Sequence, residues 1–377
     1  MDSSEKLQLW LRLARANGLG KVRIKRLYEY FQDIEKIFSC PEDEFRKITG
    51  AGKGIVRELF KKEQIEFAQK ELDKCDQLGV KLIALDSPQY PENLFQIPNP
   101  PPLLYLKGRL EEKDQRAVAV VGSRNHNEYG EVMAKKLGSG LARYGITVVS
   151  GLARGIDSIS QASALEAGGR SIAVLGSGID VIYPPEMASL YQRIVEQGAV
   201  LSEFPLGTPP NRENFPERNR IISGLSLGVV VAQASNPKSG ALLTARWALE
   251  QGRVVFAVPG NAGTVWAKAT NQLIRQGAIL VEDAQDIVED LFPQLAISQD
   301  KTAPLFSSPL RPELTEVQQR IYSLIPEPEE GSVELDRLIR QSGLDSSQVQ
   351  SALIELELEG LIEKLAGGKW RKKLIPM

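Results

Sequence analysis

Histidine and cysteine are nearly absent from this chain of 377 residues, which has one histidine, His126, and two cysteines, Cys40 and Cys75. A single histidine argues against a metal site built from several histidines, and against a catalytic triad unless His126 itself is the base. The cysteines lie far apart without metal-binding spacing and fit a reduced compartment. We therefore expect no metal site and a cytoplasmic location.

Long apolar runs and a strong net charge are also missing. No apolar run is long enough to cross a bilayer, and the first ten residues, MDSSEKLQLW, lack the basic and apolar regions of a signal peptide. We expect neither a membrane partner nor secretion. Because the net charge is only −2, the protein as a whole does not attract polyanions. Any polyanion binding must depend on local clusters of basic residues.

Residues 1–72 have the apolar spacing of short helices, and we predict helices over 22–31 and 55–67. Glycine-rich turns at 17–20 and 48–54 separate them, as in a helix-hairpin-helix or SAM-like domain. Such hairpins can present backbone N–H groups to a DNA backbone. They can equally end the helices of a simple packing module.

Residues 80–292 alternate short apolar runs with helical segments. Most of the runs are continuous, which indicates strands covered on both faces. The pattern predicts an α/β fold, an extended Rossmann-like doubly wound sheet of largely parallel strands. The predicted strands are 80–85, 103–108, 117–121, 147–150, 171–175, 199–202, 229–232, 254–258 and 278–281.

Residues 293–312 are rich in proline and serine and are predicted to form a linker. Residues 313–377 have the pattern of a winged helix, which begins at a capping box at 315–318. Its predicted elements are helices at 333–340 and 347–359 and a β-wing over 360–371. Over 308–377, 9 basic residues stand against 12 acidic ones, which favours protein contacts or regulation over DNA binding.

The segment 117–130, AVAVVGSRNHNEYG, combines a predicted strand, the turn Gly122-Ser123-Arg124 and the start of a predicted helix at 129–144. Backbone N–H groups at a helix N-terminus, together with an arginine fork, suit a phosphate group. An ordinary strand-to-helix turn would give the same pattern. Further glycine turns follow other strands at 150–155, 176–178 and 259–261, and a doubly wound sheet brings such turns to one edge.

The segment 211–220, NRENFPERNR, concentrates arginine around one aromatic residue. Arginine forks can hold successive phosphates while an aromatic ring stacks on a base, which suits single-stranded nucleic acid. The alternative is an internal network of these arginines with Glu213 and Glu217 around a buried Phe215. Because Arg124 and Arg154 are expected at the same sheet edge, we favour the binding interpretation.

Enzyme signatures are incomplete. The dinucleotide fingerprint G-x-G-x-x-G is absent, since Val181 stands where the third glycine should follow Gly176-Ser177-Gly178. Asp157 and Asp180 follow predicted strands and could act as general bases. We favour the alternative that they fix loops through hydrogen bonds to the backbone.

Several strings along the chain match one known family. They are Tyr90-Pro91, Pro101-Pro102, Leu104-Tyr105, VVGSR at 120–124, SGLARGID at 150–157, AVLGSGIDVIYP at 173–184, LSEFP at 201–205, FPERNRIISGLS at 215–226, SGALLTA at 239–245 and AVPGN at 257–261. In these strings the chain resembles the DprA (Smf) family of bacterial DNA-processing proteins. The resemblance is dense over 80–290 and loose in both flanking domains.

This resemblance implies a protein that forms a homodimer through its Rossmann domain and binds single-stranded DNA. It also implies that the protein protects incoming DNA and loads RecA onto it during natural transformation. The family is not known for enzymatic activity, so the resemblance implies no catalytic residue and no cofactor. The DNA-binding residues carried over by motif are Ser123, Arg124, Arg212, Phe215, Arg218, Asn219, Arg220 and Lys238. Arg154 joins them because its turn is expected at the same sheet edge.

The chain departs from the family pattern at three positions, with Gln161 in place of histidine, Gln233 in place of an acidic residue and Ala269 in place of glycine. A competing resemblance is to cytokinin-activating phosphoribohydrolases, whose PGGxGT loop holds a nucleotide phosphate. The loop here reads PGNAGT at 259–264, and no acidic residue follows in the expected place. Ser150 and Ser239 also lack a base partner for a nucleophile.

Overall fold

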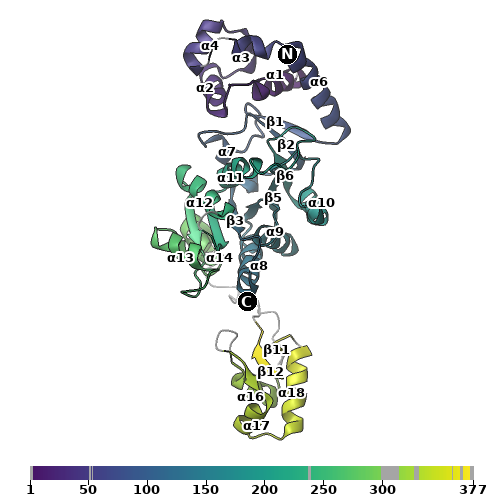
Figure 1. Ribbon diagram of the computed structural model, residues 1–377, viewed down its shortest axis with the longest axis vertical. Helices are drawn as coiled ribbons and strands as arrows, with labels where there is room; N and C mark the ends of the chain where they lie inside the picture. The colour runs from purple at the N-terminus through teal and green to yellow at the C-terminus, as the bar shows by residue number, and fades with distance from the viewer. Residues whose placement is uncertain are drawn as a thin grey trace. The chain divides into compact units, whose positions relative to one another are not determined.

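The structure is a computed structural model that describes residues 3–50, 52, 54–236, 239–298, 314–326, 331–358, 360–365 and 368–373. Its contacts divide the chain into two compact units, Met1–Ala296 and Ile297–Met377. Figure 1 shows the elements of both units. Each unit is described by itself.

The first unit begins with a helical region, as the glycine-interrupted pattern predicts. Its helices are α1 (Ser3–Arg15), α2 (Lys21–Phe31), α3 (Ile34–Ser39), α4 (Glu42–Thr49), α5 (Ile55–Leu59) and α6 (Lys62–Gln77). Gly18 and Gly54 lie in the predicted hairpins with φ angles of +81° and +94°, in the left-handed region that favours glycine. Both turns therefore depend on these glycines.

The prediction of one helix over 55–67 is wrong, because the backbone becomes extended at Lys61 and α6 starts afresh. The buried Arg12 of α1 explains the break. Its Nε and Nη2 donate to the carbonyl oxygen of Leu59 at 2.8 Å and 2.7 Å. This oxygen is one that the end of a helix leaves without an intrahelical partner, and the arginine provides one.

A nine-stranded sheet follows, with strand order β1-β2-β6-β5-β4-β3-β7-β8-β9. Its strands are β1 (Lys81–Ala84), β2 (Leu103–Gly108), β3 (Ala117–Gly122), β4 (Thr147–Ser150), β5 (Ser171–Val174), β6 (Ala199–Ser202), β7 (Gly228–Gln233), β8 (Val254–Ala257) and β9 (Ile279–Leu280). The pairs β1–β2 and β2–β6 are antiparallel, and the remaining pairs are parallel. The predicted doubly wound α/β sheet is confirmed.

Helices cover both faces of the sheet (Figure 1). They are α7 (Glu92–Phe95), α8 (Glu128–Arg143), α9 (Ile156–Glu166), α10 (Ala188–Gln197), α11 (Asn214–Leu225), α12 (Gly240–Glu250), α13 (Lys268–Arg275) and α14 (Ala284–Leu291), with 3-10 turns η1 (Glu112–Gln115) and η2 (Pro185–Met187). Strand β3 shows why the apolar runs are continuous. Ala119 and Val121 belong to one hydrophobic core, whereas Val118 and Val120 belong to the core on the other face.

The first of these cores continues into the helical region. Trp10 of α1 and Leu27 of α2 are fully buried in the same apolar cluster as Leu104 of β2. A buried polar contact joins the same parts, because the hydroxyl of Tyr105 donates to the carboxylate of Glu71 in α6 at 2.9 Å. The helical region and one face of the sheet therefore share their interior.

The second unit is the predicted winged helix. Its elements are α16 (Glu316–Leu324), β10 (Val333–Glu334), α17 (Leu335–Ser342), α18 (Ser346–Leu358), β11 (Ile362–Leu365) and β12 (Lys369–Lys372). The capping box is confirmed, since Gln318 N–H donates to Thr315 Oγ1 at 3.3 Å and Thr315 N–H donates to Gln318 Oε1 at 2.7 Å. The helix predicted from 333 starts two residues later, because Val333 pairs with Trp370 in the small sheet.

The segment predicted as a linker starts with a short helix, α15 (Pro293–Ser298). Proline fits the first turn of a helix, where its missing N–H would have no intrahelical partner. The rest of the segment, 299–312, lies outside the described residues. In the described part of the chain, no helix has both the length and the apolar character needed to cross a membrane.

Candidate nucleic-acid interface

The glycine turns found in the sequence lie at one edge of the sheet. Strands β3, β4, β5, β7 and β8 are parallel, so the turns that follow them meet at their carboxyl ends. In sheets of this type ligands bind beyond the carboxyl ends of the strands. The predicted gathering of the motifs at this edge is confirmed.

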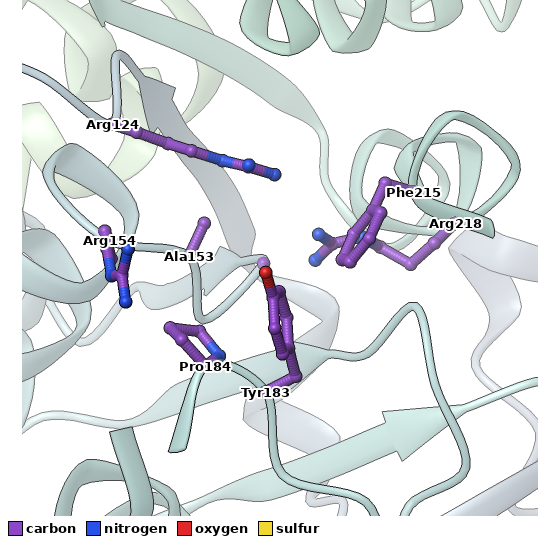
Figure 2. A pocket seen from close by; sticks show the side chains of 8 residues that line it. Arg124, Ala153, Arg154, Tyr183, Pro184, Phe215 and Arg218 are labelled. Carbon is purple, nitrogen blue, oxygen red and sulfur yellow. The ribbon is translucent and has the colours of Figure 1, made fainter. Parts of the chain in front are cut away.

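A small pocket of about 40 Å³ lies at this edge, shown in Figure 2. It is lined by Arg124, Gly151, Ala153, Arg154, Tyr183, Pro184, Phe215 and Arg218. Sites that enclose a small molecule usually have roughly 300–1,000 Å³. The shape therefore fits a surface contact with part of a larger ligand better than an enclosed substrate.

Glycine residues allow close contact between the turn after β3, which carries Arg124, and the turn after β4, which carries Arg154. A Cβ on Gly122 would lie 2.5 Å from the side chain of Ile156. A Cβ on Gly155 would lie 2.4 Å from the carbonyl oxygen of Ser123, and Gly155 also has a φ of +81°. Any larger residue at these positions would push the turn of Arg124 away from the turn of Arg154.

Asp157 connects the turn that begins at Gly122 with the turn that begins at Gly151. Its carboxylate accepts hydrogen bonds from the N–H groups of Gly122 at 3.4 Å and Gly151 at 3.2 Å. Burial raises the pKa of Asp157, and Arg218 partly opposes this increase. Asp180 likewise accepts from the N–H of Gly207 at 2.8 Å. Both aspartates thus fix loops, which is the role favoured from the sequence.

Arg218 reaches the pocket from α11 and is 4% exposed. Its Nη1 donates to the carbonyl oxygen of Val174, while its Nε is buried without a hydrogen-bond partner among the described residues. Burial lowers the pKa of Arg218 to about 10, with Arg124 contributing and Asp157 opposing. Gly151 makes room for it, since a Cβ there would lie 2.1 Å from Nη1. The pocket thus contains a buried cation that is incompletely hydrogen-bonded.

Two arginines approach the ring of Phe215. The Cζ atoms of Arg124 and Arg218 are 5.7 Å and 5.9 Å from the centre of its ring. Arg124 is exposed and forms no ion pair within the described residues. Figure 2 shows its guanidinium extending across the pocket toward Phe215. The structure therefore brings together Arg124, Phe215 and Arg218, which the sequence assigned to one site.

Two other predicted residues lie at the pocket or beside it. Arg154 lines the pocket but forms an ion pair with Glu186, and hydrogen bonding to Glu186 raises its pKa. Ser123 does not line the pocket, and its hydroxyl donates to the carbonyl oxygen of Asn125. Glu186 therefore offsets part of the positive charge that Arg154 brings to the pocket.

The remaining predicted residues do not line the pocket. Arg212 is exposed two residues before α11. Asn219 is buried, and its Nδ2 donates to the carbonyl oxygen of Gly240 at 3.2 Å. Arg220 is 1% exposed and forms an ion pair with Glu203, so this guanidinium is built into the interior. Lys238 lies outside the described residues.

The departures from the family pattern occupy supporting positions. Gln161 is fully buried, accepts from Leu152 N–H at 3.1 Å and donates to Ser171 Oγ at 3.0 Å. Gln233 accepts from the N–H of Asn127 at 3.1 Å, next to the turn of Arg124. Both glutamines satisfy groups that shape the edge of the sheet, and neither lines the pocket.

The site prediction missed four of the residues that line the pocket, Gly151, Ala153, Tyr183 and Pro184, and Tyr183 is the aromatic one among them. It lies at the end of the matched string AVLGSGIDVIYP, where an aromatic residue follows a glycine-rich turn after a strand. That position was the available signal. Within the described residues no group of three or more histidine, cysteine, aspartate or glutamate side chains could hold a metal ion.

Comparison with known sequences gives one consistent result. Residues 81–292 match the profile of the family described as DNA recombination-mediator protein A, and residues 307–368 match the DprA winged helix domain. Protein Smf of Synechocystis is 31% identical over 391 residues, covering 97% of this chain and 98% of that protein. Protein Smf of Escherichia coli is 40% identical over 309 residues, covering 81% and 82%.

Two solved structures are similar as well. DNA processing protein A from Streptococcus pneumoniae has a TM-score of 0.67 at 34% identity, covering 77% of this chain and 98% of that one. DNA processing protein A from Helicobacter pylori, described for its single-stranded DNA binding mode, has a TM-score of 0.52 at 28% identity. That match covers 57% of this chain and 96% of the other.

Proposed function

We propose that this chain, which belongs to the DNA recombination-mediator protein A family, binds single-stranded DNA at the carboxyl edge of its sheet. The matches over 81–292 and 307–368 confirm the family that the sequence resemblance predicts. Proteins of this family take part in DNA processing for recombination. The Helicobacter pylori relative is described as binding single-stranded DNA, which supports the same ligand here.

The observation that carries the proposal is the meeting of Arg124 and Arg218 at the ring of Phe215. Phosphate groups bind to cations with free donors; Arg124 is exposed without an ion pair among the described residues, and Arg218 lines the same pocket. A base can stack on an aromatic ring only when it is not paired in a duplex. The combination therefore favours an unpaired strand.

The proposal includes the cellular role that the family resemblance implies. The protein would protect incoming single-stranded DNA in the cytoplasm and load RecA onto it during natural transformation or recombination. We assign it no catalytic residue and no cofactor. Arg124, Arg218, Phe215 and Arg154 would contact DNA in the pocket, and Arg212 would contact the strand outside it.

We also propose that the protein forms a homodimer through the sheet domain. Strand β9 is the last strand of the sheet, and both of its residues, Ile279 and Leu280, are exposed, at 37% and 46%. An open edge strand with apolar side chains is a surface that proteins usually cover. A second copy of the chain at this edge would cover both its hydrogen-bonding groups and its apolar side chains.

The test is binding of fluorescent oligo-dT across a salt series, with a matched duplex as competitor. Arg124→Ala should weaken binding about tenfold, because one charge-assisted contact to phosphate is lost. It should also reduce the slope of log K against log salt by about 0.7, the share of one phosphate contact.

The matched control is Arg143→Ala. Arg143 is an exposed arginine in the last turn of α8, which runs from the carboxyl edge back toward the opposite edge. Arg143→Ala removes the same charge at a position away from the proposed site, so the affinity for oligo-dT should hardly change. Equal effects of both variants, or stronger binding to the duplex, would refute the proposed site. Arg220→Ala is unsuitable, because it would leave the buried Glu203 without its partner.

A further inference from the structure

Tyr183 is an exposed aromatic residue without an assigned role. It lies in the loop after β5, and 43% of its surface is exposed. Its ring centroid is 6.0 Å from that of Phe215, and the two ring planes are tilted by 48°. In Figure 2 its hydroxyl points into the pocket, on the side where Arg124 enters.

The hydroxyl of Tyr183 has no hydrogen-bond partner within the described residues. In contrast, Tyr90, Tyr129 and Tyr191 of the same unit donate to main-chain carbonyl oxygens at 2.7–2.9 Å. Each buried tyrosine in the described part of this unit, Tyr90, Tyr105 and Tyr191, uses its hydroxyl within the chain. Tyr183 presents both an exposed ring and an unused polar group at the pocket.

The loop that carries Tyr183 is fixed before any ligand binds. Ser177 Oγ donates to the carbonyl oxygen of Val181 at 2.7 Å. The hydroxyl of Tyr191 donates to the carbonyl oxygen of Ile179 at 2.9 Å, and Asp180 accepts from Gly207 N–H at 2.8 Å. A ring on such a loop loses little conformational entropy when it stacks on a ligand.

The spacing of the two rings decides how bases could use them. A base held between two rings needs one van der Waals spacing on each side, about 7–8 Å in total. Tyr183 and Phe215 are closer than this and are not parallel. The pair therefore cannot hold one base between them, so a strand that uses both rings must stack a separate base on each.

We propose that Tyr183 is a second stacking residue, which takes the base next to the one on Phe215. The phosphate between the two bases would lie within reach of Arg124, whose guanidinium extends across the pocket on the side to which the hydroxyl of Tyr183 points (Figure 2). This inference rests on the proposed single-stranded DNA binding. It assigns two consecutive nucleotides to the pocket rather than one.

The experiment compares oligo-dT with an abasic oligonucleotide of equal length, which has the same phosphates but no bases. Tyr183→Ala and Tyr183→Leu should weaken oligo-dT binding about 5- to 100-fold, as expected for the loss of one stacked base. Tyr183→Phe keeps the ring and should stay within about threefold of wild type. Binding of the abasic strand, and the salt slope with oligo-dT, should not change, because no charge is removed.

Tyr30→Ala is the matched control, since Tyr30 is 62% exposed on α2 in the helical region. Its loss should leave oligo-dT binding unchanged. Unchanged oligo-dT affinity in Tyr183→Ala, or equal losses on oligo-dT and the abasic strand, would overturn the inference. If Arg124→Ala still weakens binding in that case, the proposed function stands and only the role of Tyr183 fails. If wild type shows no salt-dependent preference for the single strand, both fail.

Discussion

Two buried arginines lie at opposite ends of strand β5, and their surroundings differ. Arg170 precedes the strand, and its guanidinium donates to both carboxylate oxygens of Asp114 at 2.9 Å and to Glu111 at 2.9 Å. Arg218 reaches the other end, donates to Val174 and keeps a buried Nε without a partner among the described residues. One arginine is neutralised by the chain, and the other lacks a hydrogen-bonded counterion.

The pKa directions express the same difference. Burial acts to lower the pKa of Arg170, but the hydrogen bond and charge of Asp114, with Glu111, raise it above its ordinary value. Burial lowers the pKa of Arg218 to about 10, and Asp157 opposes this only in part. The two arginines therefore differ in whether the chain supplies a hydrogen-bonded carboxylate, and the one without it lies at the pocket where we propose that DNA binds.

The largest expected effect is on stability, from Arg170→Ala. This change leaves Asp114 buried without its partner and should cost about 3–5 kcal/mol in the free energy of unfolding. Urea unfolding measures this, and the folded fraction should still bind oligo-dT normally. Arg193→Ala is the control, because Arg193 forms a surface ion pair with Glu166. A loss of DNA affinity in folded Arg170→Ala would break the comparison.

Arg218→Met should give the reverse pattern. The apolar chain fills similar space, and the hydrogen bond that is lost goes to a main-chain carbonyl oxygen rather than to a carboxylate, so the free energy of unfolding should fall by about 1.5 kcal/mol or less, well below the loss for Arg170→Ala. Affinity for oligo-dT should fall by about 1.5–3 kcal/mol, the value of a charge-assisted hydrogen bond. If urea unfolding shows the same loss as for Arg170→Ala, Arg218 is structural and the contrast disappears.

Acidification should increase the difference between Arg218 and Arg170, because it removes the negative charge of Asp157 near Arg218. Burial raises the pKa of Asp157, so ionisation of this carboxyl costs stability above its native pKa. That cost is relieved as pH falls through the native pKa. Loss of the negative charge should also increase oligo-dT affinity severalfold on lowering the pH from neutral, as measured at constant ionic strength. Asp157→Asn should not show this increase; an identical pH response would contradict the assignment.

The smallest effect is expected from Glu186→Gln. The hydrogen bond to Arg154 lowers the pKa of Glu186, so the pair is fully ionised at neutral pH. Both side chains are exposed, and such pairs are weak. The variant should release Arg154 and give a small rise in oligo-dT affinity, with a salt slope steeper by about 0.7. Glu166→Gln, which frees Arg193 elsewhere, should leave both quantities unchanged.

Much of the fold could be predicted from the sequence, because a continuous apolar run such as 117–121 is typical of a strand that is covered on both faces. The gathering of the glycine turns then followed from the parallel order of the strands. Which arginines face the pocket and which are buried in ion pairs could not be predicted. Arg218 and Arg220 are two residues apart on α11, which places them about 200° apart around the helix. One faces the pocket and the other faces Glu203. Without the orientation of α11, sequence gives both the same role.

The sequence position of Tyr183 offered a signal, but the direction of its side chain could not be predicted, for a different reason. Its loop is shaped by hydrogen bonds to distant segments, such as that between Asp180 and Gly207. The break at Lys61 likewise depends on Arg12, a residue far away in the chain. Local patterns predict elements well, but they do not contain such tertiary hydrogen bonds.

The interior shared by the helical region and the sheet bears on how the protein unfolds. Trp10 and Leu104 are fully buried in the same cluster, so neither part can open without exposing the other to water. The winged helix has its own apolar cluster around Ile321 and Leu353. Calorimetry should therefore show two cooperative transitions rather than three, with the helical region and the sheet melting together. In this sense the N-terminal helices are part of the sheet's folding unit, and only the C-terminal unit could be gained or lost without rebuilding a core.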